Sequence, residues 1–94
     1  MDRYIEKFIT YLEVEKNYSP HTLLNYTIDL EEFILFTDKT PLTKVDYLLL
    51  RRYLAEIRKK ELKPRSLARK MSSLRSFFKF LHRENLVRKI RRNF

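Results

Sequence analysis

The chain has 94 residues and a net charge of +9, and it contains no cysteine and no glycine. This length favours a single domain with one compact core, and the lack of cysteine excludes disulfides and thiolate metal sites. No apolar run approaches the roughly 20 residues of a membrane span, and the first residues lack a secretory signal, so we expect a cytoplasmic protein with no membrane partner.

The charge is divided unevenly along the chain. Residues 1–50 hold 5 Lys/Arg and 9 Asp/Glu, a net charge of −4, whereas residues 51–94 hold 16 and 3, a net charge of +13. Such a basic block is typical of nucleic-acid binding, because each cation that neutralises a phosphate releases condensed counterions. The alternative is a solvated basic helix face.

Apolar residues at helical spacing predict the first helix over residues 3–16, with Asp2 as a possible cap. Ser19 can cap the second helix, which Pro20 opens and which should reach about Phe36.

A polar link over residues 38–45 separates the first two helices from the second two. Asp46 should cap a third helix that reaches about Lys60, and Pro64 should open a fourth that reaches about Glu84. No segment alternates with the period of a strand. The sequence therefore predicts an all-α fold, a four-helix bundle made of two helical hairpins.

The second and fourth helices carry the same apolar pattern. Pro20 and Pro64 lie 44 positions apart, and leucine and phenylalanine recur at equal offsets from both prolines. Asp29, Glu31 and Glu32 of the first copy are replaced by serine, arginine and serine in the second. This exchange predicts a scaffold helix and a helix that faces a polyanion. Asp29 and Glu32 are interpreted as part of a solvated acidic face.

A helical wheel of the fourth helix predicts a core stripe of Leu67, Met71, Leu74, Phe78 and Leu81. Phe80 lies beside the opposite, polar face, and we expect it to pack on the first helix or on a neighbour absent from this sequence. The opposite side is basic and contains serines, whose small size allows close approach to a groove. The expected DNA-facing residues are Arg65, Arg69, Ser72, Ser73, Ser76 and Lys79. Serine as neutral surface filler is the alternative.

The second helix can contribute at its positive N-terminal end, where its dipole favours a phosphate. His21, Thr22 and Asn25 are the expected secondary DNA contacts. His21 and Thr22 could equally be plain residues of the capping turn.

Three segments together resemble a known family: residues 18–26 (YSPHTLLNY), 50–54 (LRRYL) and 66–78 (SLARKMSSLRSFF). The chain resembles the N-terminal core-binding domain of tyrosine site-specific recombinases of the Xer and phage-integrase type over roughly residues 3–86. The resemblance implies a four-helix SAM-like bundle that forms half of a C-shaped clamp around duplex DNA. It also implies three partners: double-stranded DNA, a C-terminal catalytic domain of the same protein and neighbouring recombinase protomers on DNA.

Two departures from the family pattern stand out. Lys63 occupies a helix-cap position where the family often has serine, and Phe94 replaces the proline of the usual linker. We assign residues 1–86 to the DNA-binding domain and residues 87–94 to a basic tail or linker towards a catalytic domain.

Catalytic and metal-binding patterns are missing from the sequence. His21 and His82 are followed three positions later by Leu24 and Asn85, so neither forms the His-x-x-Arg box of the family's catalytic domain. We expect no catalytic residue, no metal ligand and no cofactor, and therefore no enzyme activity in this chain.

The sequence thus predicts a domain that positions a tyrosine recombinase on its site for integration, excision or dimer resolution. Two alternatives stay open: a stand-alone helical nucleic-acid-binding module, and a protein-interaction bundle whose basic face docks an acidic partner.

Overall fold

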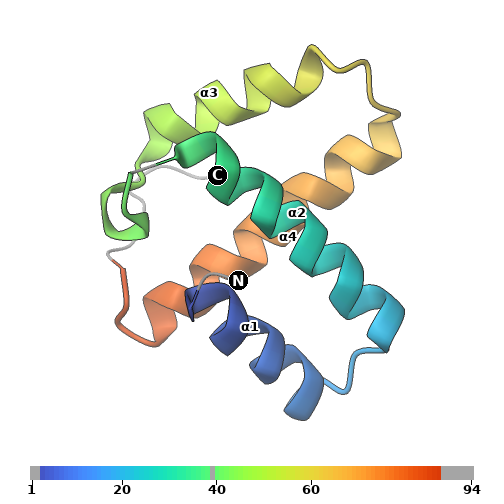
Figure 1. Cartoon of the computed structure of the whole chain (residues 1–94), viewed down its shortest axis with the longest axis vertical. Coiled ribbons are helices and arrows are strands. Elements are labelled where there is room, and N and C mark those ends of the chain that lie inside the picture. Colours follow the sequence, from blue (N-terminus) through green and yellow to red (C-terminus); the bar gives the residue numbers. More distant parts are fainter. Residues whose placement is uncertain (1–2, 39, 88–94) are drawn as a thin grey trace.

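The computed structural model describes residues 3–38 and 40–87, which form four α-helices and one short 3-10 helix (Figure 1). The elements are α1 (Arg3–Val14), α2 (Pro20–Thr37), the 3-10 helix η1 (Leu42–Lys44), α3 (Tyr47–Arg58) and α4 (Pro64–Arg83). These residues contain no strand, so the predicted all-α class is confirmed. Each α-helix begins at the predicted residue and ends within two residues of the predicted end, whereas η1 was not predicted.

Two of the predicted caps start their helices as expected. The Ser19 hydroxyl accepts a hydrogen bond from the Thr22 N–H at 3.3 Å, and the Asp46 carboxylate accepts one from the Leu49 N–H at 2.9 Å. Lys63 makes no side-chain cap bond before α4. The possible Asp2 cap and residues 88–94 of the expected tail lie outside the described residues.

The helices α2 and α4 form the centre of the molecule. In Figure 1, α2 passes across α4, and each of these two helices packs against the other three. The chain is thus two hairpins, α1–α2 and α3–α4, joined through the η1 segment. The way in which α2 and α4 cross determines which of their side chains are buried at the crossing and which are exposed beside it.

A chain of aromatic rings runs through the core and touches all four α-helices of the described region. Phe8 of α1 lies 5.4 Å from Phe77 of α4, whose neighbour Phe78 lies 5.8 Å from Phe33 of α2. Phe33 in turn lies 5.1 Å from Tyr53 of α3, ring centre to ring centre. The Phe33 pairs are edge-to-face and the Phe8–Phe77 pair is tilted. Edge-to-face pairs add about 0.5–1.5 kcal/mol each beyond the area that they bury.

The buried side of α4 is rotated from the predicted stripe. Leu67 and Met71 are only half-buried, whereas Phe77 and Phe80 are buried. The reason is tertiary, because α1 and α2 both pack on the side of α4 that carries these phenylalanines. Of the two alternatives for Phe80, the structure shows packing on α1, with its ring 5.3 Å from that of Phe8.

Each α-helix is followed by a residue with positive φ, although the chain has no glycine for these positions. Asn17, Asp38, Glu61 and Asn85 have φ between 52° and 60°. Asparagine and aspartate tolerate positive φ better than most residues do, whereas glutamate has no such preference. Glu61 is thus the least favourable residue type at these four sites.

No helix in the described part of the chain has the length and apolar composition that a membrane crossing requires.

Candidate nucleic-acid interface

The outer face of α4 is basic. Arg65, Ser72, Arg75 and Lys79 are all exposed and recur at helical spacing on the side of α4 that faces away from α1 and α2. We call these four residues the outer face of α4. Three of them were predicted as DNA-facing, and Arg75 was missed although it follows Ser72 by three positions on the same face.

Asp29 of α2 contradicts the prediction of a solvated acidic face. It is 1% exposed, and its carboxylate accepts hydrogen bonds from three side chains of α4. Arg69 donates through Nε at 3.1 Å and Nη2 at 2.9 Å, Lys70 donates through Nζ at 3.1 Å, and the Ser73 hydroxyl donates at 2.9 Å. Lys70 Nζ also donates to Glu32 at 2.7 Å. These five residues form what we call the α2–α4 ion cluster.

The ion cluster corrects the prediction for Ser73. Its side chain is buried and its hydroxyl is bonded to Asp29, so it does not face outward. A helical wheel of α4 alone could not predict the burial of Ser73, because its partner Asp29 comes from α2. Lys70 was missed for the same reason, since a lysine is rarely buried unless it is paired.

Arg69 has an intermediate position between the ion cluster and the surface. Its guanidinium holds Asp29 with two donors, yet 43% of its side chain stays exposed. A planar fork of this kind suits bidentate carboxylate recognition and fixes the orientation of the guanidinium. Arg69 therefore joins the buried cluster to the outside of the α2–α4 crossing.

The three predicted contacts on α2 lie in its first two turns. His21 is exposed, and Thr22 and Asn25 are half-buried. Thr22 accepts a hydrogen bond from the Ser19 hydroxyl at 3.0 Å, which favours the capping-turn alternative for this residue. Asn25 lies one turn before Asp29, on the side of α2 that meets Arg69.

Ser76 and Lys79 share a groove with residues of the first hairpin. This groove has a volume of about 550 Å³, and its lining includes Lys16, Tyr18 and Tyr26. Ser76 is half-buried there, so it faces the groove rather than the outer face of α4. Neither Lys16 nor Tyr18 was among the DNA contacts predicted from the sequence.

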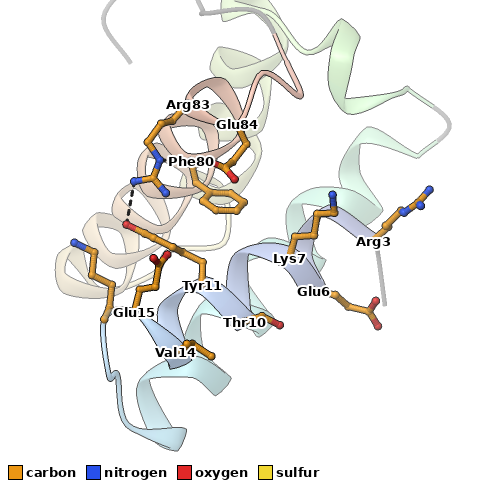
Figure 2. Close-up of a pocket in the computed structure, with 11 residues that line it drawn as sticks. Arg3, Glu6, Lys7, Thr10, Tyr11, Val14, Glu15, Phe80, Arg83 and Glu84 are labelled. Atoms are coloured by element: carbon orange, nitrogen blue, oxygen red, sulfur yellow. Dashed lines mark hydrogen bonds and ion pairs between the residues drawn. The ribbon is translucent and has the colours of Figure 1, made fainter.

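A larger groove of about 1120 Å³ lies between α1 and the end of α4 (Figure 2). None of the nine predicted DNA contacts lines it, and its lining includes Glu6, Glu15 and Glu84. These carboxylates offset most of the charge of the four cations in the same lining, Arg3, Lys7, Lys16 and Arg83, so this groove favours a phosphate backbone less than the basic face of α4 does.

Tyr11 and Arg83 stand at the edge of this larger groove. Figure 2 shows the Arg83 guanidinium donating a hydrogen bond to the Tyr11 hydroxyl at 3.1 Å. The same guanidinium lies 4.6 Å from the centre of the Tyr11 ring, a cation–π distance. The bond to Arg83 lowers the pKa of Tyr11 from its ordinary value of 10.0, because the cation stabilises the phenolate.

In the described residues no group of three or more His, Cys, Asp or Glu side chains is arranged to hold a metal ion. The outer face of α4 and the smaller groove beside it carry cations, hydroxyl groups and aromatic rings. Those groups bind phosphates and base edges.

Two crossed helical hairpins, with a basic exposed face on α4, define a small SAM-like domain of the all-α class. The chain belongs to the phage integrase N-terminal SAM-like domain family, whose model matches residues 5–85.

Curated relatives agree with this assignment. The chain is 47% identical over 83 residues to tyrosine recombinase XerC of Anoxybacillus flavithermus, an alignment that covers 85% of this chain and 28% of the relative. It is 39% identical over 89 residues to XerC of Halalkalibacterium halodurans, covering 92% and 29%, and 46% identical over 86 residues to XerC of Leptospira interrogans, covering 88% and 28%. The chain thus spans less than a third of the length of these relatives. No solved structure matches it.

Proposed function

We propose that this recombinase N-terminal domain binds duplex DNA and positions a tyrosine recombinase on its site for integration, excision or dimer resolution. The observation that carries the proposal is the outer face of α4, with exposed cations at Arg65, Arg75 and Lys79 around the small side chain of Ser72. In this proposal the domain contributes binding and no catalytic residue, and its partners are DNA, the catalytic part of a recombinase and neighbouring protomers.

The dimensions of α4 support a contact with the major groove. Arg65 and Lys79 are 14 positions apart, about 21 Å along the helix axis. The major groove of B-DNA is about 12 Å wide, so cations at the two ends of this face can reach the backbones on both sides. Ser72 lies midway between them, where a small residue lets the helix approach the base edges.

The salt dependence of binding tests this function. We expect the affinity for a mixed-sequence duplex of about 20 base pairs to fall with salt, with a log–log slope of several units. A competing double-stranded RNA of equal length should displace the DNA poorly at matched salt. A slope near zero would contradict duplex-DNA binding, and equal competition by RNA would favour a general nucleic-acid-binding module.

A protein-interaction role has one observation in its favour. Leu24, Ile28 and Leu35 of α2 are exposed along one face of the helix, and Leu35 is 81% exposed. Apolar side chains in a row on the surface are typical of protein contact sites. Sedimentation of the chain before and after Leu35→Ser, with and without the duplex, tests whether this face associates with a second protomer.

A further inference from the structure

The groove that Ser76 and Lys79 share with the first hairpin has a distinctive lining. It lies between the turn that joins α1 to α2 and the second half of α4, and its cations are Lys16, Lys79 and Arg83. No acidic residue lines it among the described residues, whereas the adjoining larger groove of Figure 2, which shares Tyr11, Lys16, Phe80 and Arg83 with it, is also lined by three glutamates. Three tyrosines, Tyr11, Tyr18 and Tyr26, complete its walls, and we call it the tyrosine groove.

Contacts within the protein hold the walls of the tyrosine groove in place. The rings of Tyr18 and Tyr26 stack at 6.0 Å with an interplanar angle of 24°. The Tyr18 N–H donates to the Leu12 carbonyl at 3.2 Å, which anchors the turn. Arg83 is oriented by its bond to Tyr11, and its Nε lies 3.6 Å from the Glu84 carboxylate. The groove is therefore organised before any ligand arrives.

We propose that the tyrosine groove holds a phosphate of the DNA backbone, with Lys16 and Arg83 as cations that extend the outer face of α4 towards α1. The inference rests on the proposed duplex-DNA function and adds a contact from the first hairpin. Lys79 belongs to both the outer face and the groove, so a backbone strand that follows α4 reaches the groove without leaving the basic surface. Lysine, arginine and tyrosine side chains are all phosphate donors in protein–DNA complexes.

Lys16 provides the test, because it lines the groove yet lies outside the face predicted from the sequence. In Lys16→Gln we expect the log–log salt slope for a mixed-sequence duplex of about 20 base pairs to fall by about one. The same loss corresponds to roughly fivefold to tenfold weaker binding at about 0.1 M salt. Lys7→Gln is the matched control, since Lys7 is also an exposed lysine associated with α1 but lines only the larger groove, whereas Lys16 lines both grooves.

A second measurement locates the contact directly. In a titration of the ¹⁵N-labelled chain with the same duplex, the amide signals of Lys16 and Tyr18 should shift, and that of Lys7 should not. Thermal unfolding of both variants confirms that the fold is intact.

The outcomes separate this inference from the proposed function. If the wild-type chain binds the duplex and Lys16→Gln behaves like Lys7→Gln, the phosphate site is wrong while duplex binding stands. Amide signals of Lys16 and Tyr18 that stay unmoved at saturation lead to the same conclusion. If the wild-type chain shows no salt-dependent duplex binding, the proposed function fails and this site fails with it.

Discussion

Tyr53 buries a hydroxyl that has no hydrogen-bond partner among the described residues. Its ring packs against Phe33 at 5.1 Å and Phe36 at 5.2 Å, so the ring is a core residue while its polar atom is unsatisfied. Burying a hydroxyl without a partner costs about 1–3 kcal/mol by mutational data. This residue is where a single atom change should most clearly alter stability.

We therefore expect Tyr53→Phe to raise the free energy of unfolding by about 1 kcal/mol or more, because the substitution keeps the ring and removes the orphan hydroxyl. Urea denaturation of both chains measures the difference. Tyr26→Phe, on a tyrosine that is only half-buried, serves as the control. A less stable Tyr53→Phe would show that the hydroxyl has a partner in solution and would contradict this reading.

Alkaline pH should expose the same residue. Burial raises the pKa of Tyr53 above its ordinary value of 10.0, and the negative charges of Glu32 and Asp29 raise it further. The folded chain then binds more protons than the unfolded chain above about pH 10, so stability falls as the pH rises through this range.

The prediction is that wild-type stability decreases above about pH 10 more steeply than that of Tyr53→Phe. Tyr11 acts in the opposite direction, because Arg83 lowers its pKa, but it is present in both chains and cancels in the comparison. Urea titrations at several pH values between about 9 and 11 supply the two curves. Parallel curves would mean that the Tyr53 hydroxyl ionises as easily in the folded chain as in the unfolded one.

Glu61 has φ of 53° in the turn between α3 and α4. A left-handed conformation costs a residue with a Cβ roughly 1–2 kcal/mol, and glycine avoids this cost while losing more entropy on folding. We expect Glu61→Gly to stabilise the chain by about 0.5–1 kcal/mol and Glu61→Ala to give no gain. Thermal unfolding distinguishes them, and an alanine variant as stable as the glycine variant would refute the backbone explanation.

At the scale of elements, α2 and α4 meet at equivalent positions of the internal repeat. Asp29 and Ser73 lie nine residues after their opening prolines, and their side chains are hydrogen-bonded to each other at 2.9 Å. The repeated helices thus cross at their matching points. The α2 helix supplies the Asp29 carboxylate, and α4 supplies the side chains that donate hydrogen bonds to it. The difference in charge between the two repeated helices therefore stabilises their packing as well as making the surface of α4 basic.

The ion cluster should therefore be essential to the crossing. We expect Asp29→Ala to lower the free energy of unfolding by about 3–5 kcal/mol, because it leaves Lys70, with 8% of its side chain exposed, without one of its two acids. Arg69→Ala should cost less, about 1 kcal/mol, since solvent screens a side chain that is 43% exposed.

Urea denaturation measures both losses, with Arg58→Ala on the exposed side of α3 as the control. A loss for Asp29→Ala no larger than that for Arg58→Ala would contradict a structural role for the cluster. Arg69→Ala should also weaken duplex binding, but a binding change in this variant is interpretable only after its loss of stability is taken into account.

Helix starts could be predicted from the sequence, whereas burial between helices could not. Helix starts are local, so Ser19, Asp46 and the two prolines predicted them correctly. Burial at the α2–α4 crossing depends on the angle between the two helices, and a helical wheel of one helix gives no information about that angle. Ser73 and Asp29 were misplaced for that reason. The tyrosine groove was missed because it joins segments distant in sequence.

At the scale of the whole molecule, acidic and basic side chains are divided unevenly between the two hairpins. The first hairpin carries many of the Asp and Glu side chains. One of them, Asp29, is buried and holds α4 in place through its hydrogen bonds. The outer face of α4 presents the exposed cations Arg65, Arg75 and Lys79. Such a distribution favours an anionic partner that approaches α4 from outside, as the DNA duplex of the proposed function would.

Two double variants of equal charge test the DNA-binding role of the outer face of α4. Arg65→Gln with Lys79→Gln removes two cations from the outer face of α4, and Lys59→Gln with Lys60→Gln removes two exposed lysines after α3. We predict that the first pair lowers the log–log salt slope for duplex binding by about two, while the second pair leaves it unchanged. Equal slopes for the two folded variants would contradict a DNA-binding role for the outer face of α4.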